Sequence, residues 1–208
     1  MIPRPTQVQA MLDYHVPPAA VAYCLQLWQK HPFVLRLSRK RQTKLGDYRF
    51  EPVQRWHIIS VNRDLAPQPF LLTFIHEVAH LVAFERFGRR IAPHGKEWKD
   101  TFSSLMQPLL HEAVFSKEVL PILTRHMRNP KASSHADPSL VRVLYPERTT
   151  GKGQEVPLRS LVPGATFRFR SKEYRVVKHR RTRTLVEHEA SRRRYLIAQQ
   201  ALVQALED

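Results

Sequence analysis

The sequence predicts an α+β fold in which helices and a small antiparallel sheet form a first domain, and a small β-rich domain follows. Two features of the apolar pattern support this class. Apolar residues recur at helical spacing over residues 6–30 and 67–127, whereas they alternate with polar residues between 33 and 62. Short alternating segments return from about residue 156 onward, where we expect four or five strands.

A polar stretch with two prolines, RNPKASSHADPS, separates the two parts. Proline and small polar residues in such a run are typical of a connection between structured segments. We therefore place the first domain at residues 1–130, a linker at 131–138 and a basic β-rich domain at 139–208.

The elements before residue 62 follow from apolar spacing and from proline and glycine. Residues 6–30 are expected to be helical, with an interruption at Pro17 and Pro18. The sheet segment comes next, and Gly46 with Asp47 indicates a turn or a bulge within it.

The longest predicted helix begins near Pro67 and ends at about Gly88. Proline is tolerated in the first turn of a helix, and glycine is favoured just past its end. Two further helices are expected, one that starts in HGKEWKDTF after His94 and one at about 116–127.

The chain is strongly basic, with 34 Lys and Arg against 18 Asp and Glu, a net charge of +16. Residues 139–208 contain 15 basic and 7 acidic residues, and residues 1–138 contain the other 19 and 11, so each part carries +8. Such a surplus favours a polyanionic partner, most often nucleic acid. The simpler interpretation is that the charge serves solubility.

Cysteine usage and the first residues indicate the compartment. Cys24 is the only cysteine, so neither a disulfide within the chain nor a cysteine-based zinc ribbon can form. The start of the sequence lacks the basic and apolar regions of a signal peptide, and no apolar run is long enough to span a membrane. We therefore expect a soluble, cytoplasmic protein with no membrane partner.

The segment TFIHEVAHLV contains the pattern His-Glu-x-x-His within an apolar helix. His76 and His80 are one helical turn apart, so both imidazoles face the same way and can reach one metal ion. Glu77 lies beside them, where a general base can act on a water molecule at the metal. The alternative is a hydrogen-bonded polar cluster in the core.

A catalytic zinc site needs a third protein ligand and an open position. His94 is the preferred candidate, because the chain turns back after Gly88 and brings the start of the next helix towards the metal. Gly95 permits a close approach of the backbone there. Glu97, one turn later, is the rival ligand and would make a site of two histidines and one glutamate.

The segment NRDLAPQPFLLTFIHEVAHLVAFERFGRRIAPHGKEWKDTF, preceded by KLGDYRFEPVQRWHIISV, resembles the SprT-like metalloprotease family, which includes Spartan. The likeness covers about residues 5–130. It implies a zincin-like domain with one zinc ion per chain held by His76, His80 and His94, and Glu77 as the catalytic acid and base. It also implies a DNA-associated endopeptidase whose substrates are proteins trapped on DNA.

Bacterial relatives often carry a C-terminal zinc ribbon with paired cysteines, and this chain has no cysteine after Cys24. The β-rich domain is therefore expected to be a cysteine-free counterpart of that ribbon or a different module. Two other functions stay open. One is a nucleic-acid-binding protein with a closed, structural zinc site, and the other is a zinc peptidase unrelated to DNA.

Basic residues gather in two clusters that are candidates for contact with DNA. The first lies in the sheet segment and comprises Arg36, Arg39, Lys40, Arg41, Lys44 and Arg49. The second lies in the β-rich domain and comprises Lys178, Arg180, Arg181, Arg183, Arg192, Arg193 and Arg194. Basic strands with nearby aromatic rings suit a nucleic-acid backbone, although a solvated strand face has the same composition. No sequence-reading motif is visible, so we expect weakly sequence-specific binding.

Overall fold

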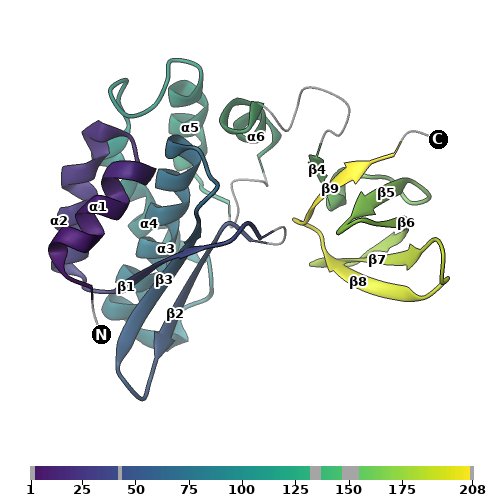
Figure 1. Cartoon of the computed structure of the whole chain (residues 1–208), viewed down its shortest axis with the longest axis horizontal. Coiled ribbons are helices and arrows are strands. Elements are labelled where there is room, and N and C mark those ends of the chain that lie inside the picture. The colour runs from purple at the N-terminus through teal and green to yellow at the C-terminus, as the bar shows by residue number, and fades with distance from the viewer. Residues whose placement is uncertain (1–2, 42–43, 132–136, 147–154, 207–208) are drawn as a thin grey trace. The chain divides into compact units, whose positions relative to one another are not determined.

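The computed structural model describes residues 3–41, 44–131, 137–146 and 155–206 (Figure 1). The chain divides into two compact units, Met1–Ala132 and Ser133–Asp208, and each is described here by itself. The first unit combines helices with a small sheet, and the second is mostly strands, so the predicted α+β class is confirmed. Among the described residues, no helix combines the length and the apolar character needed to cross a membrane.

The first unit contains most of the helices. In chain order they are α1 (Pro5–His15), η1 (Pro18–Ala20), α2 (Val21–Lys30), α3 (Pro67–Phe87), η2 (Gly88–Arg90), α4 (Lys96–Met106), η3 (Gln107–Leu109) and α5 (Val119–Met127). The short helix η1 follows Pro17 and separates α1 from α2, as the two prolines predicted.

Helix α3 is the central element of this unit, and its ends are set by local sequence signals. Pro67 and Pro69 occupy its first turn, and Gly88 ends it with a φ of 73°, a left-handed conformation that favours glycine. Apolar side chains are buried all along the helix, from Phe70 to Ala83. It packs against α4 and against two strands of the sheet.

The sheet has three strands, β1 (Val34–Ser38), β2 (Gly46–Glu51) and β3 (Trp56–Asn62), in the order β1-β3-β2. Strand β2 is antiparallel to β3, but β1 is parallel to it, so the sheet is mixed and the predicted wholly antiparallel arrangement is wrong. The reason is that β3, the strand richest in buried residues, takes the central position between two strands that precede it in the chain. Alternation of apolar residues does not encode the order or direction of strands.

Gly46 lies in a regular strand, not in the predicted turn or bulge. It pairs with Val61 and Asp47 pairs with Ser60, in an unbroken antiparallel register. The absence of a side chain is required by tertiary packing, since a Cβ at Gly46 would lie 2.5 Å from Oε1 of Glu77 and 2.7 Å from Cγ2 of Thr73. The glycine therefore lets strand β2 approach helix α3 closely.

The second unit begins with α6 (Pro138–Leu144), a helix that the sequence pattern did not predict. The side chain of Asp137 caps it by accepting hydrogen bonds from the backbone N–H groups of Ser139 and Leu140. The strands are β4 (Glu155–Pro157), β5 (Thr166–Phe169), β6 (Lys172–His179), β7 (Arg183–His188), β8 (Arg194–Ala198) and β9 (Leu202–Ala205), with the short helix η6 (Leu158–Ser160) after β4.

These strands form one antiparallel sheet in the order β4-β9-β5-β6-β7-β8. The described part of the sheet thus has one strand more than expected, because β4 contains only three residues and gives little periodic signal. One face carries the core of this unit, which includes Phe167, Tyr174, Val176 and Val186.

Candidate metal centre

Two histidines of helix α3 meet on one side of the helix. His76 and His80 are four residues apart, and their Nε2 atoms are 3.2 Å from each other. Four residues correspond to about one helical turn, so the spacing itself directs both rings to the same point. The helix backbone thus positions two of the three imidazole rings without help from any tertiary contact.

The third histidine arrives from the loop between η2 and α4. The Nε2 atom of His94 lies 3.0 Å from that of His80 and 3.3 Å from that of His76. His94 has a φ of 60°, a left-handed conformation that is uncommon for a residue with a side chain. Such strained residues are concentrated at functional sites, where surrounding structure holds them.

His76, His80 and His94 form a group able to hold a metal ion. The structure thus brings together the three histidines that the sequence analysis selected. The rival ligand Glu97, in the first turn of α4, is not a member of this group.

Aromatic rings surround the three imidazoles. The ring of Trp98 in α4 lies 4.6 Å from His76, 5.2 Å from His80 and 4.6 Å from His94, between ring centroids. The ring of Tyr48 in β2 is nearly parallel to that of His80, at 6.3 Å. This packing restricts the orientation of the rings and removes water from them.

Burial changes the protonation of the histidines. Desolvation lowers the pKa of His76 well below its usual value, lowers that of His80 to about 3 and also lowers that of His94. The neighbouring histidines add to the effect for His76 and His80, because like charges disfavour one another. The imidazoles are therefore neutral near pH 7, which is the form that binds metals.

The distances between the three histidine Nε2 atoms fit an ion with tetrahedral coordination. Ligands held at about 2.0–2.1 Å from a zinc ion, at tetrahedral angles, lie about 3.3–3.4 Å from each other. The three Nε2 separations of 3.0, 3.2 and 3.3 Å are close to that value. Three neutral imidazoles have too few protons at Nε2 to satisfy one another, so a cation at their centre suits the cluster better than mutual hydrogen bonds.

Glu77 is buried beside this cluster, with 7% of its surface exposed. Desolvation, and to a smaller degree the charge of Asp47, raise the pKa of its carboxyl group to about 8. Arg41, the backbone N–H of Tyr48 and Lys44 act in the opposite direction. Burial thus favours the protonated form of this carboxyl group, and a cation held by the three histidines would lower its pKa and favour the carboxylate.

Tyr48 and Gly46 are site residues that the sequence analysis missed. Tyr48 hydrogen-bonds Glu77 through its backbone and covers His80 with its ring, and its hydroxyl group lies 3.0 Å from Nδ1 of His57. One sequence signal could have identified them. Gly46 lies within a strand two residues before Tyr48, and glycine within a strand often marks the close approach of another group.

A model of the SprT-like family matches residues 23–122, a range that contains the three histidines, Glu77 and Tyr48. These residues form a SprT-like domain. The resemblance noted in the sequence is thereby confirmed for this part of the chain.

Curated relatives of the SprT-like domain match over short stretches. The chain is 63% identical over 27 residues to "Protein SprT" of Pseudomonas fluorescens, which covers 13% of this chain and 16% of that protein. It is 50% identical over 40 residues to "Protein SprT" of Vibrio parahaemolyticus, which covers 19% of this chain and 24% of the relative. The chain therefore spans less than a quarter of the length of these relatives, and no solved structure matches it.

Within the SprT-like domain, the basic residues predicted to contact DNA have different surroundings. Arg36, Arg39 and Lys40 are exposed on β1 and just after it, and none has an ion pair with a residue that the structure describes. Arg49 is exposed on β2. Lys44 pairs with Asp47 at 2.5 Å.

Arg41 is a structural residue in this domain. Its Nε donates to Oδ1 of Asn62 at 2.8 Å and its Nη1 to Oγ of Ser60 at 3.1 Å, while the Asn62 amide donates back to the Arg41 and Lys44 carbonyl groups. The guanidinium group thus joins the segment after β1 to strand β3, and we omit Arg41 from the proposed contacts with nucleic acid.

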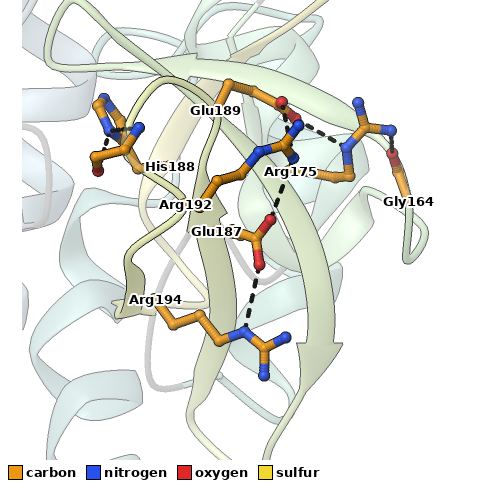
Figure 2. A network of polar contacts seen from close by, with 8 residues as sticks. Gly164, Arg175, Glu187, His188, Glu189, Arg192 and Arg194 are labelled. Atoms are coloured by element: carbon orange, nitrogen blue, oxygen red, sulfur yellow. Dashed lines mark hydrogen bonds and ion pairs between the residues drawn. The ribbon is translucent and has the colours of Figure 1, made fainter.

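In the second unit, the turn between β7 and β8 is held by an ion-pair network (Figure 2). Arg192 contacts Glu187 at 3.3 Å and Glu189 at 3.6 Å, and Arg194 contacts Glu187 at 3.4 Å. Arg175 of β6 joins through Glu189 at 2.8 Å. The hydrogen bonds from Arg192 and Arg194 lower the pKa of Glu187, and the two glutamates offset two of the three positive charges in this network.

The opposite end of β7 carries positive charge without acidic partners. Four exposed residues, here called the β6–β7 cluster, lie there: Lys178, Arg180, Arg181 and Arg183. None of them forms an ion pair within the described part of the chain. Arg193 is likewise exposed and outside the network. The structure therefore divides the arginines predicted to contact DNA in this unit into a set paired with glutamates and a set without ion pairs among the described residues.

Proposed function

We propose that this protein is a zinc-dependent endopeptidase that works in association with DNA, on proteins trapped or crosslinked there. The observation that supports the first half is the meeting of three neutral histidines and a buried glutamate within a SprT-like domain. Zinc is the proposed ion because three imidazole ligands in a tetrahedral arrangement suit it well.

In this proposal His76, His80 and His94 hold the ion. When bound, zinc supplies a Lewis acid that polarises the peptide carbonyl group and makes a water molecule more acidic. A set of three protein ligands would leave the ion able to bind water or substrate as well. Trp98 and Tyr48 keep the imidazole rings in place, which preserves the geometry between reaction cycles.

Glu77 performs the proton transfers. Its carboxylate accepts a proton from the attacking water and delivers it to the nitrogen of the leaving amine. Burial and the lack of space at Gly46 restrict the position of the carboxylate, and the backbone of Tyr48 hydrogen-bonds it. A group held in this way needs little reorganisation when the proton moves.

The association with DNA is supported by the charge distribution. Each part of the chain carries a net charge of +8, and each has exposed basic residues free of acidic partners among the described residues. We propose the β6–β7 cluster, together with Arg36, Arg39 and Lys40, as the contacts with the phosphate backbone. Such contacts bind without strong sequence preference and weaken steeply with salt.

The direct test is a protease assay on an unfolded protein substrate, with and without single-stranded or double-stranded DNA. Zinc-loaded full-length protein should cleave the substrate, DNA should increase the rate, and Glu77→Gln should bind zinc yet fail to cleave. Zinc and DNA binding without any cleavage would favour a structural zinc site. Cleavage that ignores DNA would favour a peptidase with another partner.

A further inference from the structure

A pocket with excess positive charge adjoins the metal centre. It has a volume of about 360 Å³ and lies between helix α4 and the segment that follows α5. The lining residues that matter for its charge are His94, Lys96, Lys99, Asp100, Arg128 and Asn129. All belong to the first unit, and His94 is shared with the candidate metal centre.

The pocket is built on the face of α4 opposite to the one that covers the histidines. Lys96, Lys99, Asp100 and Ser103 recur at helical spacing on this face, whereas Trp98 is buried against the three imidazoles. Because His94 comes immediately before this helix, one wall of the pocket is also part of the metal centre.

The charges of the pocket do not cancel. Lys96 and Asp100 pair at 2.5 Å and neutralise each other. Lys99 donates a hydrogen bond from Nζ to Oδ1 of Asn129 at 2.7 Å, and this neutral amide leaves its charge uncompensated. Arg128 is exposed and forms no ion pair with a described residue. The charges of Lys99 and Arg128 are thus available to an anionic ligand, and they face one further carboxylate, that of Glu97 beside Gly95.

We propose that this pocket is a substrate subsite that binds the carboxylate of an aspartate or glutamate near the bond that is cleaved. The inference rests on the proposed peptidase function. Because the pocket lies on the far face of α4, an extended peptide, which advances about 3.3–3.6 Å per residue, would pass the His94–Gly95 end of this helix to place a side chain in it. The guanidinium group of Arg128 presents paired donors that match a carboxylate.

This subsite gives the enzyme a preference at one position of the substrate. A peptide with Glu at that position should bind about fivefold more tightly than the same peptide with Gln, the size expected for a partly solvated charge pair. The difference should shrink as salt increases, because the pair is near the surface. Other positions of the peptide should show no such preference.

Binding can be measured separately from cleavage. Full-length, zinc-loaded protein carrying Glu77→Gln is titrated with fluorescent peptides in which a single Glu or Gln moves along a neutral sequence, and binding is followed by anisotropy. Adding Lys99→Gln and Arg128→Gln should bring the Glu-to-Gln affinity ratio to about one. Arg125→Gln is the matched control for Arg128→Gln alone, because each removes one arginine and Arg125 is exposed near the end of α5 and does not line the pocket.

Three outcomes would overturn the subsite: no acidic preference at any position, a preference that survives both substitutions, or an equal loss with Arg125→Gln. If the two substitutions instead weaken binding of a single-stranded oligonucleotide and leave the peptide ratio unchanged, the pocket is a phosphate site and the proposal is wrong. Cleavage by the wild-type protein is measured in parallel. Acidic preference in binding without any cleavage would reject the peptidase function and keep the pocket as a carboxylate-binding site.

Discussion

The candidate metal centre and the C-terminal sheet use titratable side chains in opposite ways. In the centre, three histidines and Glu77 are desolvated, and burial shifts their pKa values away from those in water. In the sheet, the arginines are exposed, and their availability depends on whether a glutamate lies beside them. The comparison teaches that burial determines the chemistry of the first region, whereas local pairing determines which charges of the second are free.

This difference has an energetic basis. A buried polar group costs free energy unless it is satisfied, so a cluster such as His76, His80 and His94 persists when it has a ligand to hold. Exposed charges are hydrated, and a surface ion pair contributes little to stability. Substitutions should therefore have large effects on chemistry in the centre and smaller, salt-dependent effects on binding in the sheet.

The largest effect is expected for Glu77→Gln. It keeps the shape of the side chain but removes the proton acceptor, so the rate of peptide cleavage should fall by about 10²–10⁴-fold. Zinc content, measured by elemental analysis, should stay at one ion per chain. Cleavage at the wild-type rate would show that another group acts as the base.

Removal of the third histidine should abolish tight metal binding. His94→Ala leaves two ligands on α3, and zinc affinity should fall by more than about 100-fold, since losing even an outer partner of a ligand costs about 10–100-fold. Competition with a chelating dye measures the change. Glu97→Ala is the matched comparison and should retain the metal, whereas the reverse pattern would exchange the roles of the two residues.

Gly46→Ala tests the contact between the strand and the buried glutamate. The new methyl group would lie 2.5 Å from Oε1 of Glu77, so the carboxylate or the strand must move. We expect the free energy of unfolding to fall by about 1–3 kcal/mol, as measured by urea denaturation, together with a lower rate of cleavage. Unchanged stability and rate would show that the strand–helix contact is looser than the structure indicates.

The smallest effects are expected for substitutions of arginines at the two ends of β7, which should change DNA binding by different amounts. Arg180→Gln with Arg183→Gln and Arg192→Gln with Arg194→Gln each remove two positive charges, so net charge is matched. The first pair should lower the slope of log affinity for DNA against log salt by about 1.5, and the second by less than half of that, because its arginines already pair with Glu187 and Glu189. Equal slopes would mean that total charge alone matters.

Local sequence signals alone determined the fold class, the longest helix and the positions of its two histidines. The His76-Glu77-x-x-His80 spacing, the prolines at the start of α3 and Gly88 at its end predicted the helix and its two histidines, because helix geometry depends on near neighbours. The choice of His94 also agrees with the structure, as it lies just before α4 and joins the cluster. The change from helical to alternating periodicity predicted the α+β class.

Only the tertiary structure decided how distant segments meet. Four features depend on contacts between segments that are distant in the sequence. They are the parallel pairing of β1 with β3, the contact of Gly46 with Glu77, the pocket between Lys99 and Arg128, and the pairing of Arg192 and Arg194 with glutamates. A periodic pattern records which face of an element is buried but not which partner buries it. For this reason the sequence predicted the clustering of three histidines, two of which lie on one helix, better than it predicted which arginines are free of ion pairs among the described residues.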